Sequence, residues 1–179
     1  MGNLKTICVL GMHRSGTSAI ARAVNLLGVY LGPQDKLMPP QEDNPEGFWE
    51  HMDIFSFHER LLRVLARSWD HVLPMPEEWW KKPEIEPYRQ ELKDLIRREF
   101  EGQPVWMWKD PRTSLLLPLW KETLQELGID VCYLHCLRNP LDVAAPLKKR
   151  SGLSKNRSFA LWLLYTLSSF HWRLMAPIV

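Results

Sequence analysis

The segment from Thr6 to Leu27 constrains the fold more than any other part of this sequence. The run Thr6–Leu10 is almost wholly apolar, which is typical of a strand buried on both faces of a sheet. It leads directly into a glycine-bearing loop, Gly11–Ser18, after which apolar residues recur at helical spacing as far as Leu27, just before Gly28. Strand, loop and helix in this order indicate a parallel sheet with its first loop at a helix N-terminus.

The rest of the chain repeats this alternation. Further strands are predicted at Val105–Trp108 and Ile129–Leu137, and further helices at 48–67, around 88–96, at 113–127, at 140–151 and at 156–173. Residues 33–101 form a loop-rich helical excursion between the first helix and the second strand, because prolines and polar residues interrupt it. We expect a single α/β domain over residues 1–179, with a parallel sheet and helical excursions.

Composition excludes several classes of protein. The 179 residues are 45% hydrophobic and 25% charged, which argues against a disordered chain, and a net charge of +2 is too small to indicate nucleic-acid binding. Three cysteines are too few for a disulfide framework and predict free thiols in a cytoplasmic protein. No apolar run approaches about 18 residues, and Met1–Lys5 does not resemble a signal peptide, so we expect no membrane span. No cluster has metal-ligand spacing, so no metal is expected.

Polar and charged residues follow all three predicted strands, at Gly11–Ser18, Lys109–Arg112 and Arg138–Asp142. Because the carboxyl ends of parallel strands meet at one edge of a sheet, we expect these segments to converge on one site. The first fits G-x-x-x-x-G-T-S, the glycine spacing of a phosphate loop. A nucleotide triphosphatase carries Lys where this chain has Thr17, and here the loop cation is Arg14. The alternative is a tight turn with no ligand.

Four segments carry a resemblance to a known family. Gly11–Ser18 resembles the 5′-phosphosulfate loop of sulfotransferases that use 3′-phosphoadenosine-5′-phosphosulfate (PAPS), and Leu137–Ala144 resembles their 3′-phosphate segment. Asn44–Glu50 and Trp108–Arg112 resemble segments of a bacterial branch. The resemblance covers nearly the whole chain. It implies a three-layer, P-loop-like fold and transfer of a sulfuryl group from PAPS to a hydroxyl or amine, without a metal, with residues 33–101 on the acceptor side.

The resemblance also assigns roles. It implies that the cofactor-binding residues are His13, Arg14, Ser15, Gly16, Thr17, Ser18 and Arg138. Arg14 would contact the 5′-phosphate and bridging oxygen, and Arg138 the 3′-phosphate, although Pro146 stands where the family usually has a Ser. Family members continue beyond the helix at 156–173, so the resemblance implies that a C-terminal part is missing, or is completed by a partner chain or a homo-oligomer.

The acceptor needs a general base. We favour Glu50 for this role and expect Lys109 to steady the sulfuryl group; the alternative is that Glu50 only favours a helix N-terminus. Asp110 and Arg112 are expected either to act at the site or to form a structural ion pair. A small molecule, a carbohydrate or a lipid all remain open as acceptors. Two other functions are a P-loop nucleotide kinase or hydrolase, and a non-catalytic, truncated homologue that only binds nucleotide.

Overall fold

A computed structural model describes the backbone of residues 6–174 and the side chains of residues 6–171. The expectations for Met1–Lys5 and for the chain beyond 174 lie outside this part. The strands described are β1 (Thr6–Leu10), β2 (Trp106–Lys109) and β3 (Val131–His135). The α-helices described are α1 (Thr17–Leu26), α2 (Met52–Val64), α3 (Glu86–Phe100), α4 (Thr113–Glu126), α5 (Pro140–Ser151) and α6 (Lys155–Leu174).

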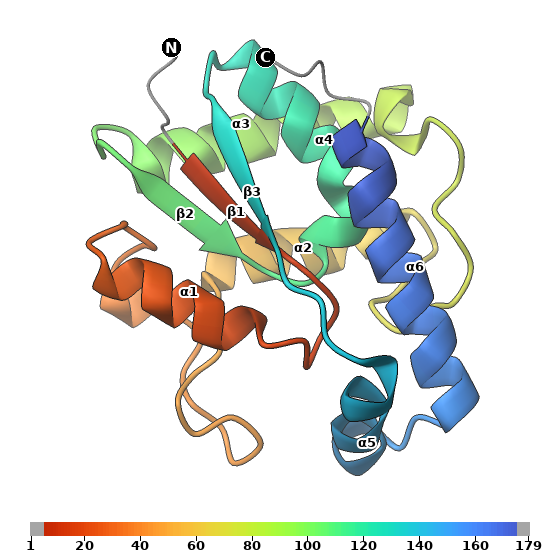
Figure 1. Cartoon of the computed structure of the whole chain (residues 1–179). Coiled ribbons are helices and arrows are strands. Elements are labelled where there is room, and N and C mark those ends of the chain that lie inside the picture. The colour runs from red at the N-terminus through yellow and green to blue at the C-terminus, as the bar shows by residue number, and fades with distance from the viewer. Residues whose placement is uncertain (1–5, 175–179) are drawn as a thin grey trace.

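The three strands form one open parallel sheet in the order β2-β1-β3 (Figure 1). Thr6 in the central strand β1 lies opposite Trp106 of β2 and Val131 of β3. The outer edge of β2 is partly covered, because the Met107 N–H donates to the carbonyl of Tyr30 at 2.7 Å. The prediction of a mixed α/β chain with a parallel sheet is confirmed.

Side chains of the sheet alternate between two apolar clusters, as the pleat requires. Cys8 and Trp108 belong to the larger cluster, which is built with helices α2, α3, α4 and α6. Ile7 and Met107 face the smaller cluster, which includes Ala21 of α1. Figure 1 shows α1 on one side of the sheet, and α3 and α4 on the other. The apolar strand sequence is therefore explained by burial on both faces.

Aromatic stacking fixes the larger cluster. The ring of Trp108 lies 4.4 Å from that of Trp120 in α4, and the ring of Trp106 lies 4.2 Å from that of Phe100 in α3, both nearly parallel. Such pairs stabilise a core by about 0.5–1.5 kcal/mol beyond their buried area. They therefore hold α3 and α4 against the same strand.

Two predicted boundaries are wrong. The helix expected from Phe48 begins at Met52, because the backbone before it is not helical: Trp49 has a positive φ of 56°, the Met38 N–H donates to the Glu50 carbonyl at 2.8 Å, and His51 forms an antiparallel bridge with Leu37. The strand expected over Ile129–Leu137 covers only Val131–His135, and its residues are half-buried because β3 lies at an edge.

Helix α5 begins as predicted. The Asn139 side chain accepts the Leu141 N–H at 2.9 Å, and Pro140 is the first helical residue. Pro146 does not end α5, which continues to Ser151. Over the described residues, no helix has both the length and the apolar character needed to cross a bilayer.

Candidate functional site

The three polar segments converge, as predicted from the sheet. A cavity of about 290 Å³ lies at the carboxyl-end edge of the strands. Its walls include Thr17 and Ser18 at the start of α1, Lys109 at the end of β2, and Arg138 after β3. Helix α5 adds Pro146 and Arg150, and the segment before α2 adds Asn44, Phe48 and Glu50.

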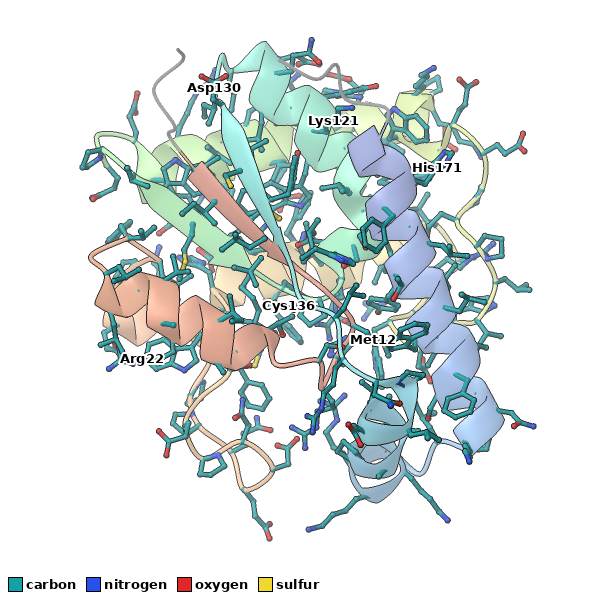
Figure 2. All side chains as sticks on the ribbon, in the orientation of Figure 1. Met12, Arg22, Lys121, Asp130, Cys136 and His171 are labelled. Atoms are coloured by element: carbon teal, nitrogen blue, oxygen red, sulfur yellow. The ribbon has the colours of Figure 1, made fainter. Side chains whose placement is uncertain are left out.

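Gly11 sets the path of the loop after β1. A Cβ atom there would lie 2.6 Å from the Cys136 carbonyl oxygen, and φ of Gly11 is 145°, so no other residue fits without strain. The Gly11 N–H donates to Ser114 Oγ at 3.2 Å. Figure 2 shows the neighbouring Met12 and Cys136, where the segments after β1 and β3 pass each other. The loop is thus held against both β3 and α4.

The loop ends at Gly16, which is the N-cap of α1 in the left-handed conformation (φ 87°) and makes no side-chain cap. The first N–H groups of a helix have no partner within it. Thr17 and Ser18, which carry two of these groups, line the cavity. The start of α1 therefore offers backbone donors and the positive end of the helix dipole to an anion.

Arg14 lies in the cavity wall with a positive φ of 68°. Its Nη1 donates to the Asp43 carbonyl at 3.1 Å, and its Nη2 lies 3.6 Å from Asp43 Oδ2. Its own carbonyl accepts a hydrogen bond from Arg138 Nη1 at 3.2 Å. The two arginines assigned to phosphate binding are therefore neighbours, although they are 124 residues apart in sequence.

Another predicted cofactor-binding residue of the loop is His13. His13 lines the cavity and is buried, with its ring edge-on to those of Trp69 and Tyr165 at 4.9 and 5.8 Å. Burial, with Arg112 and Arg150 nearby, lowers the pKa of His13 well below its ordinary value, so the ring is neutral. Its Nε2 is buried without a hydrogen-bond partner.

The hydroxyl groups of Ser15 and Ser18 differ in their hydrogen bonds. Ser15 Oγ is buried without a hydrogen-bond partner. Ser18 Oγ donates to the Phe48 carbonyl at 3.1 Å, so it ties the loop to the segment before α2.

Glu50 and Lys109 form an ion pair in the cavity wall. Glu50 Oε1 lies 2.5 Å from Lys109 Nζ, and both side chains are buried. Burial raises the pKa of Glu50, against the opposing effect of Lys109. The idea that Glu50 only favours a helix N-terminus is wrong, because Glu50 precedes the N-cap His51 and its carboxylate is paired with Lys109.

A polar network that the sequence did not reveal lies behind this pair. Trp120 Nε1 donates to His58 Nε2 at 2.8 Å, which leaves the proton of a neutral His58 on Nδ1, 2.9 Å from Asp110 Oδ2. Asp110 Oδ1 accepts the backbone N–H and Nη1 of Arg112 at 2.9 and 3.0 Å. Asp110 and Arg112 form an ion pair, and Glu59 Oε1 also lies 2.5 Å from Arg112 Nε.

Charges hold Asp110 ionised. Burial by itself raises the pKa of Asp110, but the Arg112 guanidinium and the His58 ring outweigh it and keep the pKa well below its ordinary value. His58 is 52 residues from Asp110, and its helical spacing indicated only a core position. No local sequence pattern predicts the contact between His58 and Asp110.

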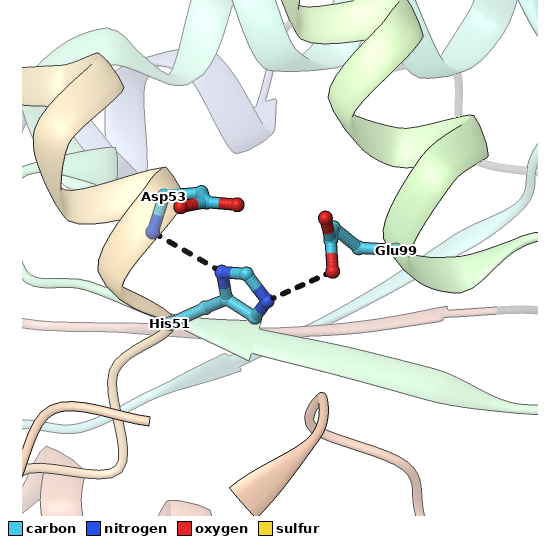
Figure 3. Close-up of side chains that lie close together, drawn as sticks. All are labelled: His51, Asp53 and Glu99. Carbon is cyan, nitrogen blue, oxygen red and sulfur yellow. Dashed lines mark hydrogen bonds and ion pairs between the residues drawn. The ribbon is translucent and has the colours of Figure 1, made fainter. Parts of the chain in front are cut away.

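A second polar cluster joins His51, Asp53 and Glu99 (Figure 3). These side chains lie close enough to share a metal ion, but other cations already pair with the carboxylates. Lys36 Nζ and Arg98 Nε each lie 2.6 Å from Glu99 Oε1, and Arg98 Nη2 lies 3.2 Å from Asp53. The cluster is thus an ion-pair network that ties α2 to α3.

The loop tryptophans pack against the protein and lie away from the cavity. Trp79 and Trp80 are buried in the larger cluster, and Trp80 Nε1 donates to Glu122 Oε1 at 2.7 Å. Trp49 packs on the smaller cluster beneath the Arg22 guanidinium, 4.5 Å from its ring centroid. These contacts give the three tryptophans a packing role, although Trp79 and Trp80 also line a second cavity of about 1110 Å³.

The chain was also compared with known proteins. Protein-family models, curated proteins and solved structures all gave no match.

Proposed function

We propose that the chain transfers a sulfuryl group from PAPS to a hydroxyl or amine of an acceptor. The observation that carries this proposal is the cavity at the sheet edge, where the Gly11–Ser18 loop meets Lys109 and Arg138. The proposal includes a three-layer, P-loop-like domain over residues 1–179. It also includes a cytoplasmic location, which the three free cysteines favour.

The charges of the cavity suit a ligand with several anionic groups. Arg14, Lys109, Arg138 and Arg150 line it, against one lining acid, Glu50. Among the described side chains that line this cavity, two buried nitrogens have no hydrogen-bond partner, His13 Nε2 and Arg14 Nε. Buried polar atoms are rarely left unpaired, so these atoms favour a polar ligand. Thr17 in place of Lys counts against a nucleotide kinase or hydrolase.

Bound PAPS would supply the sulfuryl group and leave as the bisphosphate. Arg14 and the first N–H groups of α1 would hold the 5′-phosphate, where negative charge develops as the bond to sulfur breaks. Arg138 would hold the 3′-phosphate. His13, Ser15, Gly16, Thr17 and Ser18 would complete the loop contacts.

Glu50 would accept the proton of the acceptor group. Burial raises the pKa of Glu50, which makes its carboxylate a stronger base towards the acceptor proton. Lys109 would orient the Glu50 carboxylate and, when that carboxylate takes up the proton, direct its ammonium to the sulfuryl oxygens. The acceptor itself would be a small-molecule, carbohydrate or lipid alcohol or amine.

Calorimetric titration tests the donor. We expect 3′,5′-bisphosphoadenosine to bind without Mg²⁺, and ATP with Mg²⁺ to bind more weakly. Binding of ATP–Mg²⁺ with none of the bisphosphate would replace this proposal with the kinase or hydrolase alternative.

Transfer of labelled sulfate from PAPS to a panel of acceptors tests the reaction. We expect Arg14→Ala to lower turnover by about 10²–10³, the effect of removing one transition-state donor. The control is Arg97→Ala, because Arg97 is exposed on α3. Binding of the bisphosphate without transfer to any acceptor would support the non-catalytic alternative.

A further inference from the structure

An acidic side chain from the loop before α2 lies at the arginines of the cavity. Gln41 and Asn44 pair through both backbone N–H groups, at 3.3 and 2.9 Å, so Glu42 and Asp43 form the tip of a tight turn. Asp43 Oδ2 lies 3.6 Å from Arg14 Nη2 and 4.0 Å from Arg150 Nη1. One carboxylate thus faces two guanidinium groups, one from the loop after β1 and one from the last turn of α5.

These contacts are loose. Strong pairs of guanidinium and carboxylate have N–O distances of about 2.7–2.9 Å, often with two parallel hydrogen bonds. Here Asp43 Oδ2 is buried without a hydrogen-bond partner, and so is Arg14 Nε. Arg14 and Asp43 therefore lie side by side, yet one donor of Arg14 and one acceptor oxygen of Asp43 make no hydrogen bond.

The two guanidinium groups also repel each other. Burial and the Arg14 charge lower the pKa of Arg150, while Asp43 opposes this. The Arg150 guanidinium lies over the Trp69 ring, 5.2 Å from its centroid. Arg150 lies one helical turn after Pro146, and both line the cavity. A more strongly charged anion than one carboxylate would relieve the repulsion better.

We propose that Arg14 and Arg150 form a clamp for an anionic ligand, and that Asp43 is its internal occupant, which a phosphate- or sulfate-bearing ligand displaces. The inference rests on the proposed function for the identity of the natural ligand, but the clamp itself needs only an anion. It assigns ligand binding to Arg150 and a competing role to Asp43.

Competition makes a definite prediction. Asp43→Asn keeps the shape of the side chain but removes its charge, so anions should bind roughly tenfold more tightly, which is about 1.4 kcal/mol. Arg150→Gln should weaken binding by a similar factor. In the double variant the gain from Asp43→Asn should shrink, because one of its two partners is gone.

Calorimetry at low salt with two probes, inorganic pyrophosphate and 3′,5′-bisphosphoadenosine, tests the clamp. Glu42→Gln is the matched control, because it removes the same charge from an exposed residue one position away. Asp43→Ala is the second variant, and thermal unfolding checks that each protein is folded. Tighter binding in both Asp43 variants, but not in the control, would support the clamp.

The two proposals fail separately. Equal affinities for wild type, Asp43→Asn and Glu42→Gln would overturn the clamp, even where the bisphosphate binds and transfer occurs. Tighter pyrophosphate binding in Asp43→Asn without any bisphosphate binding would keep the clamp and overturn the PAPS proposal. No binding of either probe to any variant would overturn both.

Discussion

Glu50 and Lys109 form a buried ion pair, 2.5 Å between carboxylate oxygen and ammonium nitrogen, at the edge of the sheet where the strands end. They are 59 residues apart in sequence. The pair joins the segment before α2 to strand β2. In the proposed reaction, Glu50 acts on the acceptor and Lys109 acts on the sulfuryl group.

Breaking this pair should destabilise the protein. Lys109→Met leaves Glu50 charged and buried without its partner, so we expect a loss of about 3–5 kcal/mol in the free energy of unfolding. Glu50→Gln with Lys109→Met should cost less than the two single changes added together. Urea unfolding followed by tryptophan fluorescence measures all three.

The control for this experiment is Lys81→Met. Lys81 pairs with Glu78 on the surface, where both side chains are more than half exposed, so the loss should stay below about 1 kcal/mol. An equal loss for the buried and the exposed lysine would contradict the role given to burial.

The rate of the proposed sulfuryl transfer should depend on pH through Glu50. A general base acts only when ionised, and burial raises the pKa of Glu50. Activity should therefore rise with pH through that pKa, from a point above the ordinary value for a glutamate. Glu50→Gln should remove this rise and lower turnover by about 10²–10⁴. An unchanged pH profile in the variant would assign the base elsewhere.

Stability in acid should depend on Asp110. Its folded-state pKa is lowered, so its contribution is present above the unfolded pKa and is lost as pH falls towards the folded pKa. The wild type should lose stability as pH drops below the ordinary aspartate value of about 3.9. Asp110→Asn should be less stable at neutral pH and show a shallower loss. Urea midpoints from pH 7 to pH 2 report this, and parallel curves would exclude Asp110 as the source.

Gly11→Ala should destabilise the protein more than the same change at an open glycine. The new Cβ at position 11 would meet the Cys136 carbonyl oxygen at 2.6 Å, whereas none of the described atoms lies within 4 Å of a Cβ at Gly128. Gly128 has φ 65°, so Gly128→Ala measures the strain of the left-handed region, about 1–2 kcal/mol. A larger loss for Gly11→Ala in thermal or urea unfolding measures the close approach together with the greater strain of φ 145°. Equal losses would mean that the segment after β3 can shift.

Local patterns predicted several elements well. The apolar run at Thr6–Leu10, the Asn139–Pro140 helix start and the convergence of three polar segments all appear in the structure. Boundaries were less well predicted, because the positive φ of Trp49 and the pairing of Glu50 and His51 with Met38 and Leu37 keep residues 48–51 out of α2, and no local signal in 48–51 indicates that pairing.

The alternation of strands and helices, and the edge of the sheet at which charged residues gather, can be predicted from sequence because both follow from the spacing of apolar residues along the chain. Which charges meet depends on the tertiary fold. Glu50 with Lys109, His58 with Asp110, and Asp43 with Arg14 each join residues of separate segments. Such pairs depend on the path of the loop before α2 and on burial, and neither can be predicted from the spacing of residue types along the chain.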